Sequence, residues 1–331
     1  MHPKRLCLLF ALGITTASVS VFACLWDRDT LPAEKAAFPE VSYLITGTFP
    51  RHSREYYEWL RSVCEKRIQE LPHRYQLYDD LAVAQHKLGD HKAAIETMHA
   101  KERIRPNLYE TYSNLGTFLI YTGELDEART CIEKALSINA NAHFGREKYQ
   151  LWLIEWALVR RKSPPGSQSE ELQSWYQVLR YGFAAIVARH TQGSAAVKTN
   201  GVLLTLQQQA EAIRGISGMM RFADFDNPLL LEALGDVLSA GDVEKSGSKL
   251  IALSYLHASR KAVDSSEKQR LRKRFELLVE QRDQAGLEVL LDTGLAKGRE
   301  YVESIRQDEL SWIASGKDAS AEFQKKYLPA K

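Results

Sequence analysis

Side chains that could carry out chemistry are few in this sequence of 331 residues, and their spacing suits no common catalytic site. The sequence has no Gly-x-x-x-x-Gly-Lys-Ser/Thr phosphate loop, no His-Glu-x-x-His zinc motif and no Gly-x-Ser-x-Gly elbow. His86 and His91 are five residues apart across an expected turn, whereas ligands on one helix face need a spacing of three or four. They are therefore expected as exposed turn histidines and not as a metal pair. Asp79 and Asp80 are adjacent, so they point in different directions and are expected as surface charges. We therefore expect a non-enzymatic protein without catalytic residue, cofactor or metal.

Cys24 carries the clearest chemical prediction. An uncharged run over residues 6–23 follows two basic residues, which is the pattern of a secretion signal. Val21 and Ala23 are small enough for signal peptidase, and the Cys that follows them resembles the lipobox of bacterial lipoproteins. That resemblance implies cleavage of a 23-residue leader and lipidation of Cys24. Leu25 in the next position, rather than Asp, implies the outer membrane.

Two alternatives to lipidation remain open at this terminus. Cleavage could leave Cys24 unmodified, or the run could stay uncleaved as an anchor, because 18 uncharged residues can just span a bilayer. Each alternative predicts export, either to the periplasmic face of a membrane, with the outer membrane favoured after lipidation, or as a secreted protein. A membrane partner is accordingly expected through acylated Cys24 or through the uncleaved anchor.

The composition is that of an ordinary globular protein, with 44% hydrophobic and 26% charged residues. The formal net charge is +2, and the leader holds two basic residues and no acid, so the remainder is balanced. This balance argues against a nucleic-acid partner, which requires a basic face. Cys64 and Cys131 belong to no Cys-x-x-Cys pair and are expected as free, buried thiols.

A period of 34 residues is the strongest pattern in the sequence. Residues 75–108 and 109–142 align at this offset. In each unit, apolar residues recur at helical spacing and are followed by a glycine, Gly89 or Gly123, where one helix must stop and the chain reverse. Small residues such as Gly116 would let the paired helices approach closely. Each unit is therefore predicted to be a helical hairpin.

The second unit resembles the tetratricopeptide repeat. The resemblance lies in Tyr112-Ser113-Asn114-Leu115-Gly116 and in residues 123–128, Gly-Glu-Leu-Asp-Glu-Ala. The first unit departs from the family pattern at Ala82, where a glycine is usual, and at Lys101, where a small alanine is usual. The second unit has Ala140 in place of the terminal proline. The resemblance covers residues 75–142 and implies stacked hairpins that bury their apolar faces only against neighbours.

The expected fold class is all-α, a tetratricopeptide-like helical-hairpin solenoid with additional C-terminal helices. Pro164-Pro165 marks the clearest break in the chain. Whether the part after this break continues the same superhelix stays open. The expected divisions are a signal peptide (1–23), a tether (24–52), a repeat region with flanking helices (53–161) and a C-terminal helical region (168–331) with a degenerate repeat-like pair near 228–263.

Several other segments carry predictions of their own. Residues 26–30 could be a flexible tether or a strap that docks on the solenoid. Gly215 and Gly218 favour close packing of their helix against a neighbour. The basic cluster at 268–274 is expected on a solvated helix face, because acidic residues flank it. The C-terminal helical pattern is expected in three pieces, 265–282, 286–290 and 298–313.

By the family resemblance, the first helix of each pair lines a concave groove that binds a protein or peptide segment. Asp79 stands where the family's carboxylate clamps have a lysine, so a chaperone-tail clamp is not expected. The resemblance implies a non-enzymatic interaction scaffold of the bacterial envelope with an unidentified protein or peptide partner. The implied groove residues are Gln76, Asp79, Val83 and His86 in the first unit, and Glu110, Ser113, Asn114, Thr117 and Tyr121 in the second.

The alternative function is an enzyme or a carbohydrate-binding accessory with its site in the C-terminal helices. Trp175, Tyr176 and Asp224 would serve such a site, because aromatic rings stack on sugars.

Overall fold

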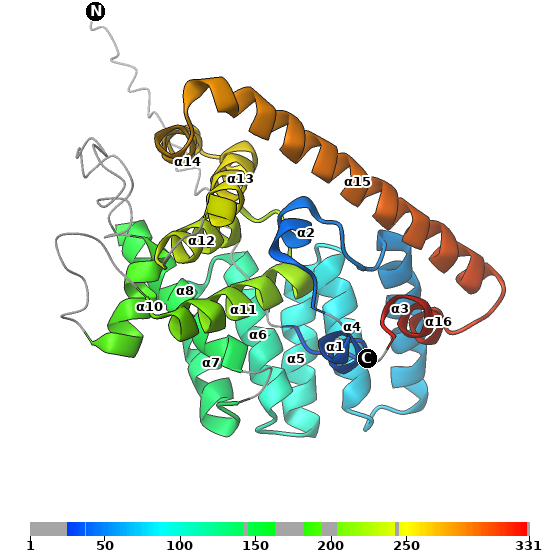
Figure 1. The fold of residues 1–331 in the computed structure, drawn as a ribbon. Helices are drawn as coiled ribbons and strands as arrows, with labels where there is room; N and C mark the ends of the chain where they lie inside the picture. The colour runs from blue at the N-terminus through cyan, green and yellow to red at the C-terminus, as the bar shows by residue number, and fades with distance from the viewer. Residues whose placement is uncertain are drawn as a thin grey trace, which may run out of the picture.

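The computed structural model describes residues 25–36, 38–141, 145–162, 182–193, 204–241 and 245–329, and these ranges contain helices and no strand (Figure 1). The all-α, tetratricopeptide-like fold class is confirmed. The predicted leader, Cys24, Trp175 and Tyr176 lie outside these residues. The helices are α1 (Thr30–Lys35), α2 (Val41–Thr46), α3 (Arg54–Glu70), α4 (Gln76–Lys87), α5 (His91–Ile104), α6 (Tyr109–Thr122), α7 (Leu125–Ile138), α8 (Arg146–Lys162), α10 (Phe183–Gln192), α11 (Leu206–Phe222), α12 (Pro228–Ser239), α13 (Lys245–Lys261), α14 (Ser265–Leu278), α15 (Gln281–Ala314) and α16 (Ala319–Tyr327).

The two repeat units form the hairpins α4–α5 and α6–α7. Gly89 and Gly123 lie at the reversals with φ of +90° and +86°, a conformation that suits glycine. Gly116 lets α6 and α7 meet, because a Cβ there would lie 2.6 Å from Cδ1 of Ile132. Asp90 begins α5 by accepting a hydrogen bond from the backbone N–H of Ala93 at 3.2 Å. The turns predicted at Gly89 and Gly123 are therefore present in the structure.

The hairpins continue into a closed ring of helices. α3 covers the outer face of α4, and α8 follows α7. α11 packs on α8, and α12, α13 and α14 follow in order. α15 then crosses from α13 back to α3 (Figure 1), so the last long helix meets the first one. One hydrophobic core extends from Leu25 to Leu291 through both halves, so the two halves are one body.

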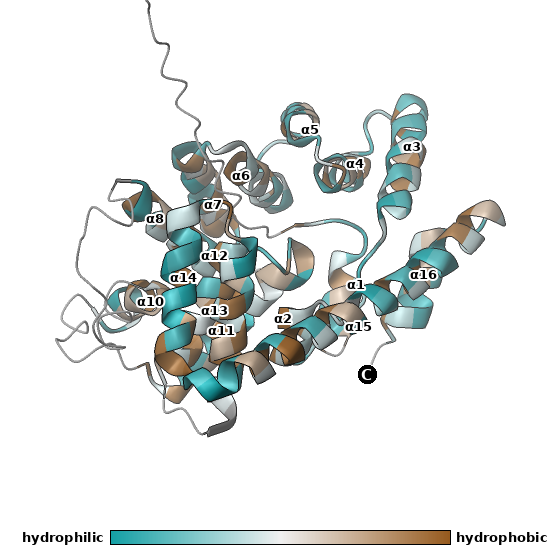
Figure 2. Cartoon of the chain, turned by 90° about the horizontal axis from the view of Figure 1, so that it is seen from above, coloured by the Kyte–Doolittle hydropathy of each residue, from teal (hydrophilic) through white to brown (hydrophobic). Residues whose placement is uncertain are grey.

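The N-terminal segment occupies the inside of this ring. In Figure 2 the repeat helices lie along one side, α15 along the other, and α1 and α2 between them. α2 packs against α11, α13 and α15. Within the predicted tether (24–52), Leu44, Ile45 and Phe49 are buried in this interior, whereas Leu31, Phe38 and Tyr43 are exposed.

α15 is one helix of 34 residues, about 51 Å long at 1.5 Å per residue, where separate pieces were predicted. Gly298, the first residue of a predicted piece, lies inside the helix, and both Gly298 and Gly294 face α2. A Cβ at Gly298 would lie 2.3 Å from the carbonyl oxygen of Thr46, and one at Gly294 would lie 2.4 Å from its Cγ2. The glycines admit a neighbouring helix and do not end their own.

Glycines also admit a neighbouring helix in α11, where close packing was predicted. A Cβ at Gly215 would lie 2.3 Å from Tyr149, and one at Gly218 would lie 2.7 Å from Arg146. This prediction is confirmed, and it explains how α11 approaches α8.

A buried ion cluster joins the C-terminal helices. Glu232 of α12 accepts hydrogen bonds from Arg160, Arg270 and Arg274 at 2.7–2.8 Å. One turn later, Asp236 accepts from Arg274 at 2.8 Å. Although burial opposes its charge, the three guanidinium groups hold the pKa of Glu232 well below its usual range. The expectation of a solvated face at residues 268–274 is therefore wrong for Arg270 and Arg274.

Candidate functional site: a groove that holds the N-terminal strap

Residues 25–30, here called the strap, lie against the inner face of α4 and α6. Asn114 of α6 binds the backbone of Trp26 on both sides: its Oδ1 accepts from the N–H at 2.8 Å, and its Nδ2 donates to the carbonyl at 3.0 Å. Asn114 is fully buried, and the Trp26 ring meets Tyr109 edge-on at 6.3 Å. Of the two alternatives for this segment, the docked strap is the observed one.

The Asn114 carboxamide is fixed from behind by a buried ion pair. Its Nδ2 also donates to Oδ1 of Asp79 at 3.2 Å. Both oxygens of Asp79 accept from Nζ of Lys101 at 2.7 Å, and Lys101 is fully buried. Lys101 and Asp79 therefore form an ion pair with each other. Both residue types differ from those that the family pattern leads one to expect. The pair orients the amide so that its oxygen faces the strap N–H.

Asp80 binds the strap at a second point. Its Oδ1 accepts from the backbone N–H of Arg28 at 2.9 Å, and its Oδ2 accepts from Nε of the same residue at 2.8 Å. Nη2 of Arg28 lies 2.8 Å from this Oδ2 in an ion pair. Asp79 and Asp80 are 5% and 7% exposed, so the expectation of two surface charges is wrong. The strap and Lys101 cover them.

Asp29 connects the strap to helices at both ends of the chain. Its carboxylate accepts from the Tyr56 hydroxyl at 2.6 Å, from Ser320 at 2.7 Å and from Gln324 at 2.6 Å. His52 lies 3.2 Å away through Nε2. Although burial disfavours its charge, His52 and these donors hold the pKa of Asp29 well below its usual range.

His52 is shared between two buried carboxylates. Its Nδ1 is 2.6 Å from Oε1 of Glu309, and its ring stacks on Tyr56 at 3.6 Å. Burial opposes the charged ring, but the hydrogen bonds and charges of Asp29 and Glu309 raise the pKa of His52 to about 9. The imidazolium thereby joins the strap to α15.

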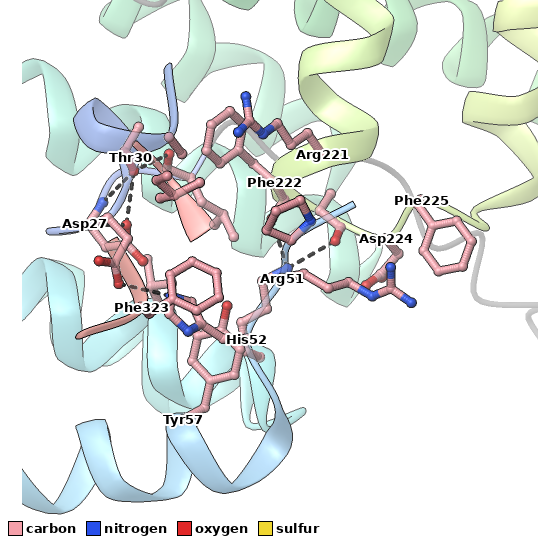
Figure 3. A pocket seen from close by; sticks show the side chains of 18 of the residues that line it. Asp27, Thr30, Arg51, His52, Tyr57, Arg221, Phe222, Asp224, Phe225 and Phe323 are labelled. Carbon is pink, nitrogen blue, oxygen red and sulfur yellow. Dashed lines mark hydrogen bonds and ion pairs between the residues drawn. The ribbon is translucent and has the colours of Figure 1, made fainter. Parts of the chain in front are cut away.

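A cavity of ≈ 300 Å³ lies beside the strap (Figure 3). Its walls come from the strap, residues 50–54, α4, residues 221–226 and α16. Lys87 enters it from α4 and donates from Nζ to the carbonyls of Phe222 and Ala223 at 2.7 and 3.0 Å. The cavity therefore lies where repeat helices and C-terminal helices meet.

Three cations line this cavity without an ion pair to any carboxylate of the described residues: Arg51, Lys87 and Arg221. Arg51 donates to the carbonyl of Gly47 at 2.5 Å and lies over the ring of Phe225 at 4.5 Å. Burial lowers the pKa of each of the three, that of Arg221 to about 10. The cavity could therefore hold a small acidic group.

His86 and His91 are a packed pair and not the exposed turn histidines that were expected. Their Nδ1 atoms are 3.0 Å apart, and His86 is buried against Phe118 and Tyr121. Burial lowers the pKa of both rings, so they are neutral at pH 7. The Tyr121 hydroxyl donates to Asp224 at 2.9 Å. In the part of the chain that the structure describes, no group of three or more His, Cys, Asp and Glu is placed to hold a metal.

The nine predicted groove residues divide by exposure. Gln76 is exposed, and Glu110 and Tyr121 are half-buried. The other six are buried, and Asn114 is the member that contacts the strap through two hydrogen bonds. The Thr117 hydroxyl accepts a hydrogen bond from Gln150 of α8 at 3.0 Å, so it contacts a neighbouring helix of the solenoid. The buried members are Asp79, Val83, His86, Ser113, Asn114 and Thr117.

Sequence reasoning did not assign Asp80, Lys101, His52 and Glu309 to the site. The contact between Asp80 and Arg28 joins residues 52 apart, and that between His52 and Glu309 joins residues 257 apart. No local pattern marks such pairs. The one available signal was the coincidence of an unexpected acid, Asp79, with an unexpected base, Lys101, in the same repeat.

Among the helices of the described ranges, none is both long enough and apolar enough to cross a membrane.

Comparison with known proteins supports the repeat assignment. Residues 109–141 match the tetratricopeptide repeat family, and this range is the α6–α7 hairpin. No curated protein and no solved structure matches the chain. Cys64 and Cys131 are both free thiols as predicted, but only Cys64 is buried, whereas Cys131 is half-buried. The chain thus contains a tetratricopeptide repeat at residues 109–141, set in an all-helical solenoid of neighbouring pairs.

Proposed function

We propose that this protein is a non-enzymatic interaction scaffold of the bacterial cell envelope, which binds a protein or peptide segment through its repeat groove. The observation that carries the proposal is the pair of hydrogen bonds from Asn114 to the backbone of Trp26. Side chains on the inner face of the repeats hold the backbone of a non-helical residue here, which is the kind of binding that the repeat family suggests.

The envelope part of the proposal rests on the sequence. The uncharged run at residues 6–23 and the following Cys24 support export with lipidation, and membrane attachment would follow from the acyl chains. Intact-mass measurement of the mature N-terminus, beside the variant Cys24→Ala, separates acylated Cys24, free Cys24 and retained Met1. A retained leader would contradict both forms of cleavage.

The binding part is tested by capture from detergent-solubilised envelope. We expect a defined partner to be recovered by the native chain and lost with Asn114→Ala plus Tyr121→Ala. Gln76→Ala is the matched control, because its side chain is exposed and outside the strap contacts. Recovery that survives the groove changes but is lost with Trp175→Ala would contradict the scaffold.

A second candidate function is binding of a small acidic ligand, and the cavity favours it. Arg51, Lys87 and Arg221 line it without a direct ion pair to a carboxylate of the described residues. Asp224 of the alternative carbohydrate site also lines the cavity. Thermal shift measurements with acidic sugars test this candidate. A shift abolished by Lys87→Met would favour it over the scaffold, whereas no shift with any of them would count against it.

A further inference from the structure

We propose that the strap is an intramolecular ligand of the groove between α4 and α6, and that the same groove takes up a segment of another protein with the strap's chemistry. That segment would have an apolar residue, then a residue bound through its backbone, then a basic residue two positions later. This inference rests on the proposed function, since it names the partner segment of the same groove.

Backbone recognition is the first part of the argument. Asn114 contacts only the peptide groups of Trp26, so it binds any residue except proline in that place. Its amide is already oriented by Asp79, and Asp79 is held by Lys101. A site whose donor and acceptor are fixed before binding loses less entropy on binding. The three side chains therefore form a preorganised peptide site.

Side-chain recognition is the second part. Asp80 receives the guanidinium of Arg28 through two nitrogens and also accepts its backbone N–H. This geometry favours arginine over lysine. Leu25, at 3% exposure, defines the apolar position. Trp26 meets the edge of Tyr109, so an aromatic ring suits the backbone-bound position.

Separate anchoring of the two ends of the strap makes exchange feasible. Residues 25–28 are held by Asn114 and Asp80 on the repeat side. Asp29 is held by Tyr56, Ser320 and Gln324, away from those groups. Within the strap, the Thr30 hydroxyl donates to the carbonyl of Leu25 at 3.3 Å and to the carboxylate of Asp27 at 3.0 Å. Residues 25–28 leave the groove while Asp29 stays bound once these local hydrogen bonds break. Because the strap is tethered, an external segment must overcome a high effective concentration, so the native chain binds weakly.

The test uses the full chain and a labelled hexapeptide with the sequence of residues 25–30. In Arg28→Glu the strap repels Asp80, so we expect at least tenfold tighter peptide binding than in the native chain, measured by fluorescence anisotropy. Adding Asn114→Ala should abolish this gain, and a peptide with Glu in place of its Arg should not bind. Arg282→Glu is the matched control, because it makes the same charge change on a side chain that is 77% exposed.

Release of the strap is followed independently by hydrogen exchange at the Trp26 amide. We expect fast exchange in Arg28→Glu and restored protection in Arg28→Glu with Asp80→Arg. Fast exchange without peptide binding would overturn the inference, because the strap would then be only a structural element. Protection that persists in Arg28→Glu and in Arg28→Glu with Leu25→Asp would overturn it too, because residues 25–28 would not leave.

The two proposals fail differently. If the hexapeptide does not bind but an envelope partner is still captured, the scaffold stands and the strap inference falls. If the hexapeptide binds as expected and no partner is captured, the groove is a peptide site and the scaffold function falls.

Discussion

Buried acids can be compared at two places, Asp79 with Asp80 in the repeats and Glu232 with Asp236 in the C-terminal helices. The charges of these two clusters are satisfied in different ways. Glu232 and Asp236 on α12 receive Arg160, Arg270 and Arg274, which all belong to helices of the ring. Asp80 on α4, by contrast, receives its cation from the strap. When helices of the ring supply all the cations, the cluster stabilises the contact between those helices and is here called a structural joint. A cluster whose cation comes from the strap is a recognition site that is already occupied.

The largest effect is expected at the C-terminal cluster. Glu232→Gln should lower the free energy of unfolding by about 3–5 kcal/mol, because three buried guanidinium groups lose their shared carboxylate. Chemical denaturation measures the change. Glu303→Gln is the control, because it removes an exposed carboxylate and should change stability by less than about 1 kcal/mol. A small effect at Glu232 would remove the contrast between the two clusters.

The next effect concerns pH and the link between strap and α15. The pKa of His52 is raised from 6.5 to about 9, so its contribution is complete below pH 6.5 and is lost as the pH rises through about 9. The native chain should lose up to about 3 kcal/mol between pH 7 and pH 10 relative to His52→Gln. Thermal unfolding of both proteins across this range gives the difference. Parallel curves would show that the ring is neutral.

A third prediction tests how firmly α2 is held inside the ring. Gly298→Ala should cost about 2 kcal/mol, because the added Cβ meets the carbonyl of Thr46 at 2.3 Å. Gly286→Ala on the same helix meets nothing within 4 Å and should stabilise by about 0.5–1 kcal/mol through helix propensity. Denaturation midpoints of the two variants should therefore move in opposite directions. If both are stabilised, α2 can move away from α15.

The smallest global effect is expected at the strap. Asn114→Ala removes two hydrogen bonds to Trp26 and should cost about 1–2 kcal/mol. Its effect should be local, so hydrogen exchange at Trp26 should accelerate while exchange at Glu232 in α12 stays unchanged. A global loss as large as that of Glu232→Gln would show that the strap is another structural joint.

The repeats could be predicted because their signals are local. Gly89, Gly116 and Gly123 recur at fixed positions of a 34-residue period, and the structure uses each of them as the pattern implies. The close packing at Gly215 and Gly218 followed from composition in the same way.

Ring closure could not be predicted, because it depends on which helix a small residue faces. Gly298 weakens a helix on propensity alone, and only the presence of Thr46 beside it explains why the helix continues. The burial of Asp80 likewise depends on Arg28, 52 residues earlier. The sequence shows that an acid and a base are present, but it does not show that they form an ion pair.

The strap also has a mechanical consequence. The first described residue, Leu25, is already buried in the ring, and Asn114 holds the next one. If the chain is attached to a membrane through Cys24, no slack separates the attachment point from the groove. A pull between membrane and protein would then act first on Asn114 and Asp80, and would draw residues 25–28 out before it strained any repeat helix. The groove would open under load, and its occupancy would report tension at the anchor.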